Sequence, residues 1–380
     1  MAVQEISVMR RLGHLKWTHP ATEIGLSVAE MDFMTSPTVS QAILSAVTGG
    51  QLGYPSETIE AGLKTATALW LAENYGWHVS AQDVQLVPDV VRAYHVAIER
   101  FCAAGADVIV PVPAYPAFLS VPRMLGRRVI TTRLDLDGNR YAMDMSSLEQ
   151  ALKGGDRLLV LCNPGNPTGT VFTREELLAI SELVEQYGAR VFSDEIHAPL
   201  VLYGSHTPYA SVSAAAASHC LTAVSASKAW NIAGLKCAQV IVSNGPDRDT
   251  WKSLNRLWTD GASTLGMIAA TAAYCEGGEW LDDVKRLLRG NRTRLEELLV
   301  QHLPGVEYHP SDATYFAWLG FGNVDGVPSL PARHFRERVG VDVVEGREFD
   351  GSGADFVRLN FATSRANIES GVARIARSLR

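Results

Sequence analysis

The central part of the chain alternates short runs rich in β-branched residues with segments of helical periodicity. Between two of these runs, Thr173 and Glu176 match a capping box, an apolar stripe follows, and Gly188 suits a helix end. Strands that alternate with helices are typical of an α/β fold with a largely parallel sheet, so we predict that fold class. The expected strands are residues 107–111, 128–134, 157–162, 189–194, 221–226 and 239–244.

The pattern changes at about residue 279. Residues 279–303 form a long, charged amphipathic segment, and strand-like runs follow at 313–319 and 356–363. The first 45 or so residues contain too little periodic structure to fold alone, and we expect them to pack against this part. The sequence therefore predicts a large domain over residues 46–278 and a smaller α+β domain over 1–45 plus 279–380.

Charge and cysteine content exclude several classes of protein. The 380-residue chain has a formal net charge of −7 and a pI near 5.8, so we expect no nucleic-acid partner and no anionic membrane partner. The five cysteines form no CxxC pair, which favours reduced thiols over disulfides or a zinc site. No apolar run approaches the roughly 18 residues of a membrane helix, and the N-terminus lacks the apolar core of a signal peptide. We predict a cytoplasmic protein.

Polar residues at the strand ends carry the functional signal, because ligands of parallel α/β sheets bind beyond the carboxyl ends of the strands. Residues 163–169, NPGNPTG, can present amide donors there, although an elaborate turn would look the same. Asp194 ends the next strand, and a buried carboxylate requires a cation from the protein or a ligand. Asp194, Glu195 and His197 also suggest a metal. However, successive residues of a strand point to opposite faces and no HExxH motif is present, so we expect none.

Lys228 lies in SASKAW, residues 225–230, between two apolar runs. For an isolated lysine, a surface turn is the simpler interpretation. A lysine in a partly apolar cleft, however, has a lowered ammonium pKa and can serve as a nucleophile for a carbonyl group. Nearby hydroxyls, backbone N–H groups and a helix N-terminus suit a phosphate. A nucleophilic lysine, a phosphate site and an acid that needs a cation together match pyridoxal 5′-phosphate (PLP).

These residues belong to a set of motifs that resembles a known family. The chain is similar to the fold type I PLP enzymes, the aspartate-aminotransferase-like class I/II aminotransferases, and among them to the MalY/PatB-type C–S lyases. The resemblance covers nearly the whole chain and implies a three-layer PLP-transferase fold that works as a homodimer. Its motifs occur in the family's order: KWTHP, VAEMDF, PVPAYPAF, NPGNPTG, SDEIHAPLV, SASKAWNIAGLK, GGEWLDDV, DATYFAWL and VRLNFAT.

The resemblance assigns the cofactor ring to five residues. Lys228 matches the lysine that binds the aldehyde of PLP, and Asp194 the carboxylate beside the pyridine nitrogen. Asn166 and His197 lie where the family contacts or supports the O3′ side of the ring. Tyr115 matches the aromatic residue that stacks on the pyridine, although taken alone it could be a core tyrosine.

The resemblance also implies a phosphate site and a substrate site. The phosphate is expected on the backbone N–H groups at the start of the helix after residue 88 and on nearby polar groups: Val90, Val91, Ser225, Ser227, Lys236 and, from the neighbouring subunit, Tyr54. Arg358 matches the arginine that binds the substrate's α-carboxylate through two parallel hydrogen bonds, and Ala29 lies beside it. An arginine on a surface strand is the alternative for Arg358.

Three positions depart from the family pattern. Asp89 stands where relatives have Gly before the phosphate helix, and its carboxylate can act as N-cap. Glu30 stands where Asp is common, and a Trp that usually precedes Val28 is missing. The last two changes lie near the expected substrate pocket, so substrate preference transfers less directly than cofactor chemistry.

The resemblance implies β-elimination from an L-cysteine S-conjugate such as cystathionine, giving a thiol, pyruvate and ammonia. Lys228 would remove the Cα proton while Asp194 keeps the ring protonated. Aminotransfer with the same residues is the alternative, because local sequence does not decide between the two reactions. A regulatory binding protein on an old PLP scaffold is a third hypothesis, which the complete set of catalytic residues disfavours.

Overall fold

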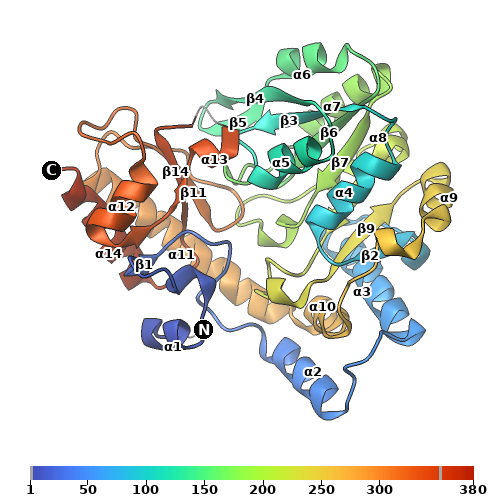
Figure 1. The fold of residues 1–380 in the computed structure, drawn as a ribbon, viewed down its shortest axis with the longest axis horizontal. Coiled ribbons are helices and arrows are strands. Elements are labelled where there is room, and N and C mark those ends of the chain that lie inside the picture. The colour runs from blue at the N-terminus through green and yellow to red at the C-terminus, as the bar shows by residue number, and fades with distance from the viewer. Residues whose placement is uncertain (1–2, 351–352) are drawn as a thin grey trace.

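A computed structural model describes residues 3–350 and 353–380, and its largest element is an eight-stranded sheet (Figure 1). The strands run in the order β2-β9-β8-β7-β6-β3-β4-β5. Their bounds are Val84–Val87 (β2), Asp107–Val112 (β3), Val129–Asp137 (β4), Arg140–Met143 (β5), Arg157–Cys162 (β6), Arg190–Asp194 (β7), Cys220–Val224 (β8) and Ala238–Val242 (β9). The neighbours among β4, β3, β6, β7 and β8 pair in parallel, whereas β9 pairs antiparallel with β8, β2 with β9, and β5 with β4.

Helices cover both faces of this sheet. Val108, Val110 and Val160 pack on one face with α4 (Val90–Arg100) and α5 (Pro116–Met124). Ile109 and Leu159 point the other way. That face carries α6 (Met145–Leu152), α7 (Arg174–Gln186) and α8 (Ala214–His219). Because successive strand residues alternate between two apolar layers, the sheet is buried on both sides and the three-layer α/β prediction is confirmed.

The capping box and the apolar stripe in the sequence predicted helix α7 correctly. The Thr173 side chain accepts a hydrogen bond from the Glu176 N–H, and the Glu176 carboxylate accepts one from the Thr173 N–H, so the expected capping box is present. The expected strands are all observed to within a few residues, although the one at 221–226 ends at Val224, so that Ser225 already lies beyond it. The short strands β2 and β5 were not predicted.

A second, four-stranded antiparallel sheet lies beside the first (Figure 1). Its order is β10 (Glu307–Tyr308), β11 (Phe316–Gly320), β14 (Phe356–Asn360) and β13 (Val344–Glu345). The flanking helices are α11 (Gly278–His302), α12 (Pro331–Val339), the short α13 (Arg347–Asp350) and α14 (Arg365–Ser378). In α11, Leu281, Val284 and Leu288 repeat at helical spacing and are buried, as the amphipathic pattern predicted.

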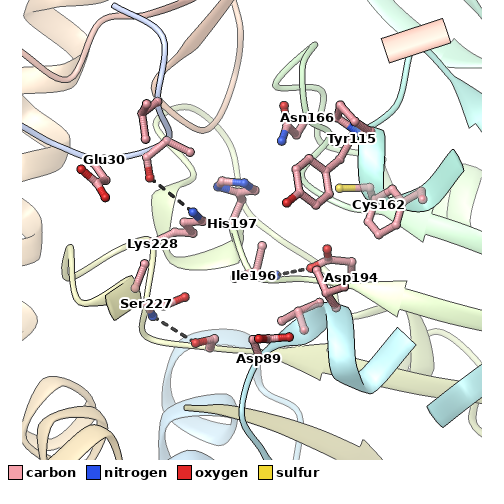
Figure 2. A pocket seen from close by; sticks show the side chains of 18 of the residues that line it. Glu30, Asp89, Tyr115, Cys162, Asn166, Asp194, Ile196, His197, Ser227 and Lys228 are labelled. Atoms are coloured by element: carbon pink, nitrogen blue, oxygen red, sulfur yellow. Dashed lines mark hydrogen bonds between the residues drawn. The ribbon is translucent and has the colours of Figure 1, made fainter. Parts of the chain in front are cut away.

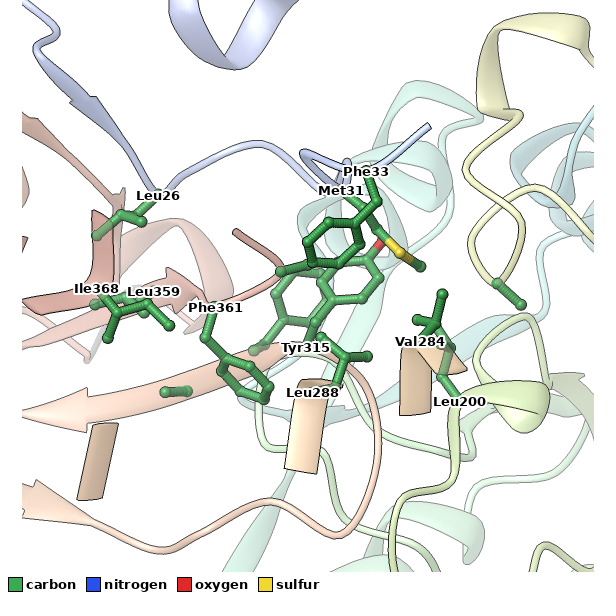
Figure 3. Packing of buried hydrophobic residues seen from close by; sticks show 14 of the residues in the cluster. Leu26, Met31, Phe33, Leu200, Val284, Leu288, Tyr315, Leu359, Phe361 and Ile368 are labelled. Carbon is green, nitrogen blue, oxygen red and sulfur yellow. The ribbon is translucent and has the colours of Figure 1, made fainter. Parts of the chain in front are cut away.

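The N-terminal segment packs against this second sheet. Strand β1 (Ile24–Gly25) pairs in parallel with β12 (Val341–Asp342), and Figure 3 shows Met31 and Phe33 packed close to Tyr315. The following helix, α2 (Pro37–Thr48), instead packs against α10 (Thr264–Glu276) (Figure 1). The proposed boundary at residues 45 and 279 remains a prediction. No helix within residues 3–350 and 353–380 is long and apolar enough to cross a membrane.

Candidate active site

The carboxyl ends of β6, β7 and β8 are side by side, so the loops that follow them meet. Cys162 pairs in register with Asp194, and Asp194 with Ala223. The loops border a cavity of about 490 Å³ whose far side is formed by β13, β14, α13 and the segment Ser27–Asp32, which we call the strap. Twelve of the thirteen predicted site residues line it: Ala29, Val90, Val91, Tyr115, Asn166, Asp194, His197, Ser225, Ser227, Lys228, Lys236 and Arg358.

Lys228 follows β8 and points its amine toward the strap (Figure 2). Its Nζ donates a hydrogen bond to the Ala29 carbonyl at 3.3 Å, and no carboxylate of the described residues forms an ion pair with it. Burial, followed by the positive charge of Arg358, lowers the pKa of the Lys228 ammonium. A larger fraction of the amine is therefore neutral than in an ordinary lysine, as a nucleophile or base requires.

Asp194 is the last residue of β7 and is 5% exposed. Its Oδ1 accepts a hydrogen bond from the Ile196 N–H at 3.0 Å (Figure 2), while Oδ2 accepts none from the described residues. Burial raises the pKa of this carboxyl to about 7. A cationic N–H placed beside Asp194 would stabilise the ionised form, which is the partner that the sequence predicts.

The neighbouring Glu195 points to the opposite side of the strand. It accepts hydrogen bonds from Ser193 Oγ and the Tyr209 N–H, both at 2.9 Å, and lies 2.9 Å from His206 Nε2. This network is buried and separate from the cavity. Within the described part of the chain, no group of three or more His, Cys, Asp or Glu side chains could hold a metal ion.

His197 and Asn166 border the same space from different loops (Figure 2). The His197 ring is 3% exposed and packs edge-on against Phe316, and its Nδ1 has no hydrogen-bond partner in residues 3–350 and 353–380. Burial lowers the pKa of His197 to about 3, so the ring is neutral at physiological pH. Asn166 Oδ1 accepts a hydrogen bond from Arg358 Nη1 at 3.0 Å, which couples the NPGNPTG loop to the second sheet.

Arg358 reaches the cavity from β14, an inner strand of the second sheet, and is 6% exposed. Besides Asn166, it donates from Nη2 to the Ser27 carbonyl at 3.0 Å, and its guanidinium lies 4.1 Å from the Phe316 ring centre. Its Nε has no hydrogen-bond partner in the described part of the chain. Burial lowers the pKa of Arg358 to about 10, so it remains charged at neutral pH. The alternative of a surface arginine is wrong.

Val90 and Val91, the first residues of α4, also line the cavity. Asp89 caps this helix, because its Oδ1 accepts from the Arg92 N–H at 2.8 Å. Its Oδ2 lies 2.9 Å from Lys236 Nζ, which offsets the negative charge of the carboxylate. The orphan N–H groups of a helix N-terminus and a lysine suit a phosphate.

The two serines of SASK differ in availability. Ser225 Oγ donates to the Cys237 carbonyl at 2.7 Å and accepts from the Ser227 N–H at 3.1 Å. The Ser225 hydroxyl therefore supports the turn. The Ser227 hydroxyl has no hydrogen-bond partner among the described residues and lines the cavity.

Tyr54 is the one predicted residue that does not line the cavity. It lies between α2 and α3 (Glu57–Tyr75) and is 96% exposed. The sequence reasoning also missed some lining residues, among them Glu348 and Phe349 of α13. No local pattern marks that short helix, because its position depends on Phe349 packing against Trp318.

A family model described as aminotransferase class I and II matches residues 21–375, so the chain belongs to this family of PLP-dependent enzymes. The cystathionine β-lyase of Corynebacterium glutamicum is 40% identical over 381 residues, with 99% of both chains covered. Cystathionine β-lyase PatB of Bacillus subtilis is 33% identical over 381 residues, covering 97% of this chain and 98% of PatB. A solved structure from Corynebacterium diphtheriae, assigned as a PLP-dependent β-cystathionase, matches with a TM-score of 0.94 at 40% identity, covering 100% and 99%. The resemblance drawn from the motifs is confirmed.

PLP is the cofactor of this family, and the cavity suits its three chemical parts. Among the described residues, none forms an ion pair with the Lys228 amine or places a cation in contact with the buried Asp194 carboxyl. The N-terminus of α4 and Lys236 also line this cavity. These groups match an aldehyde, a pyridine nitrogen and a phosphate, respectively. Buried polar atoms such as His197 Nδ1 cost free energy unless a ligand satisfies them.

Proposed function

We propose that the protein is a PLP-dependent C–S β-lyase that cleaves cystathionine or a related L-cysteine S-conjugate to a thiol, pyruvate and ammonia. One observation carries this proposal: a lysine amine of lowered pKa shares a cavity with a buried, unpaired carboxyl and a buried arginine. The relatives named as cystathionine β-lyases, which align over the full chain, support it over the other reactions of the family.

When bound, PLP supplies an aldehyde that takes up an amino group and a ring that withdraws electrons from the substrate Cα. Lys228 would hold the aldehyde, and Asp194 would keep a proton on the ring nitrogen by opposite-charge attraction. Val90, Val91, Ser227 and Lys236 would hold the phosphate end, while Ser225 would support the turn that carries Ser227. Tyr115 would lie against the ring, with Asn166 and His197 beside it.

Lys228 is the group that moves the proton. Its amine, once free, would take the Cα proton, after which the Cβ–S bond breaks and the sulfur leaves as a thiolate. The lowered pKa favours this role, because an amine that is protonated at the working pH accepts no proton. The three-carbon product would then take up water to give pyruvate and ammonia.

Arg358 would orient the substrate. Its guanidinium is buried, charged and already held in place by Asn166 and the Ser27 carbonyl, so it can bind a carboxylate through two parallel hydrogen bonds with little loss of side-chain freedom. Ala29, whose carbonyl accepts from both Lys228 and Tyr315, fixes the strap beside that carboxylate.

Aminotransfer is the second candidate, because the matching family model is described as aminotransferase class I and II. Product analysis separates the two. We expect pyruvate and thiol to form from cystathionine in equal amounts without any keto acid present. Amino-group exchange with an added keto acid and no thiol release would show an aminotransferase instead.

The proposal includes a homodimer in the cytoplasm. The exposed Tyr54 would complete the partner's phosphate site, and the five cysteines, all free thiols, suit a reducing compartment. Mixing inactive Lys228→Ala with an inactive Tyr54→Phe variant should restore part of the activity through hybrid dimers. A fully active monomer would contradict the shared site.

A further inference from the structure

The turn that carries Lys228 is bonded directly to the strap. Residues 226–231, which we call the lysine turn, follow β8, and a hydrogen bond of 3.0 Å from the Ile232 N–H to the Ser227 carbonyl closes their end. The turn ends at Asn231, whose φ of 56° lies in the left-handed region. Asparagine and glycine adopt that region more readily than other residues, so the residue type suits the end of the turn.

The Asn231 side chain joins the lysine turn to the strap. Its Nδ2 donates to the carbonyls of Met31 and Phe33, both at 3.0 Å, and its Oδ1 accepts from the Met31 N–H at 2.9 Å. Beside this amide, Thr35 Oγ1 donates to the Trp230 carbonyl at 2.6 Å. The lysine turn and the strap therefore separate only if four hydrogen bonds break.

The same two segments meet again at the reacting amine. Lys228 points its Nζ toward the strap (Figure 2) and donates to the Ala29 carbonyl at 3.3 Å. Asn231 lies three residues after Lys228, and its partner Met31 lies two residues after Ala29, so covalent chain and hydrogen bonds form a closed ring. Because the ring is short, the position of the Ala29 carbonyl relative to Lys228 depends on the Asn231 amide.

A fixed acceptor matters for the proton transfer of the proposed function, on which this inference rests. In that step the substrate Cα–H bond breaks, the proton passes to Lys228 Nζ, and the electron pair is left to the cofactor ring. A neutral amine has one lone pair, and donation of an N–H to the Ala29 carbonyl limits the directions in which that lone pair can point. A misplacement of about 1 Å in such a step costs about a hundredfold in rate.

We propose that Asn231 is a positioning residue for the Cα proton transfer, because it holds the Ala29 carbonyl against the Lys228 amine and so directs the amine toward the substrate. Within the described residues, the lining of the cavity does not include Asn231, so it acts through these two groups. Arg358 and Asn360 bind the first half of the strap from β14. The site of the substrate carboxylate therefore does not depend on the Asn231 amide.

Asn231→Gly tests the proposal, since glycine keeps the left-handed backbone and removes only the amide. L-Alanine has no leaving group on Cβ, so deuterium uptake at its Cα from heavy water reports the proton transfer alone. We expect the exchange rate to fall about ten- to hundredfold, while the dissociation constant of L-alanine changes less than about threefold. With cystathionine, kcat should fall by a similar factor at nearly constant KM.

Backbone hydrogen exchange gives a readout without turnover. The Met31 N–H is bonded to Asn231 Oδ1, so it should exchange faster with solvent in Asn231→Gly. Thr35→Val removes the second link and should slow deuterium uptake by L-alanine less than Asn231→Gly does. Thr35→Ser keeps the hydroxyl and should restore the rate.

Asn244→Gly is the matched control. Asn244 follows β9 outside the cavity and makes the same set of bonds, because its Nδ2 donates to the carbonyls of Ala217 and Ser218 and its Oδ1 accepts from the Asp247 N–H. Glycine is tolerated at this helix N-cap. The substitution should leave both the Cα exchange rate and L-alanine binding unchanged.

The outcomes separate this inference from the proposed function. If the wild-type protein exchanges the Cα proton of L-alanine but releases no thiol from cystathionine, the lyase function is wrong, and the Asn231 comparison still decides the positioning role. If Asn231→Gly exchanges the Met31 N–H faster but the Cα proton at the wild-type rate, the lyase stands and this inference falls. It also falls if L-alanine binding weakens by the same factor as the rate, or if Asn244→Gly reproduces the loss.

Discussion

The two walls of the cavity satisfy their polar groups in different ways. The sheet wall, formed by the loops after β6, β7 and β8, leaves the Lys228 amine with one weak partner and Asp194 Oδ2 and His197 Nδ1 with none among the described residues. In the strap wall, which is formed by the strap and the second sheet, the backbone carbonyls of the strap accept hydrogen bonds from side chains. Asn360 donates to the carbonyls of Val28 and Glu30.

The difference separates chemistry from positioning. A buried polar group without a partner costs about 1–3 kcal/mol, so the sheet wall is organised for a ligand that supplies those partners. On the strap wall, Arg358, Asn360 and Tyr315 bind backbone carbonyls of one segment and hold it at a fixed distance from the sheet. Substitutions on the sheet wall should therefore reduce turnover, and those on the strap wall should weaken binding.

Lys228→Ala is the strongest test of the sheet wall. The variant removes the group proposed to take the Cα proton, so pyruvate formation should fall by about a thousandfold or more while some PLP still binds. Borohydride reduction of the native protein should attach the cofactor to the peptide containing Lys228. Attachment of the cofactor to any other peptide, or an active Lys228→Ala protein, would show that the sheet wall does not carry out the chemistry.

Asp194→Asn should have the next largest effect. The substitution keeps the shape and the hydrogen bond from the Ile196 N–H but removes the charge that, under the proposed function, would hold a proton on the ring nitrogen. We expect kcat to fall by about a hundred- to thousandfold, as for other lost electrostatic contacts to developing charge, with KM nearly unchanged. A near-normal kcat would mean that this carboxyl does not face the ring.

The sequence could locate the sheet wall because strand ends mark it. In an α/β sheet the residues after β6, β7 and β8 must converge, so Asn166, Asp194 and Lys228 were predictable from strand positions and polar residue types. Cys162, the last residue of β6, pairs in register with Asp194, so the loop that carries Asn166 begins beside this carboxyl. The family resemblance then supplied a chemical role for each.

The strap wall was less predictable. Arg358 was found through the resemblance, but its bond to Asn166 joins residues 192 positions apart, and Glu348 depends on how Phe349 packs against Trp318. These are tertiary contacts with no periodicity in the sequence. The antiparallel edges of the large sheet, such as β2 and β5, were missed for a simpler reason: four residues carry too little pattern.

Arg358→Lys sharpens the contrast between the two walls. A lysine keeps the charge but loses the planar pair of donors, and it cannot bond Asn166, the Ser27 carbonyl and a carboxylate at once. KM should rise about ten- to hundredfold with a smaller change in kcat, because charge-assisted hydrogen bonds are lost mainly in binding. Steady-state kinetics with cystathionine measures both constants. A defect confined to kcat would place Arg358 with the sheet wall instead.

Asp89→Asn should give the smallest effect and tests the phosphate end of the sheet wall. Asparagine can still cap α4 by accepting from the Arg92 N–H, but it removes a negative charge next to the expected phosphate and releases Lys236. Because both side chains are partly exposed, we expect PLP to bind the apoprotein only about twofold to fivefold more tightly, measured by fluorescence titration.

Asp83→Asn, which breaks the ion pair with Arg248 outside the cavity, is the control and should not change the affinity. Adding Lys236→Met should abolish the gain if the released lysine causes it. Weaker PLP binding in Asp89→Asn would show instead that Asp89 orients Lys236 for the phosphate, so that this end is prearranged by protein contacts in the manner of the strap wall.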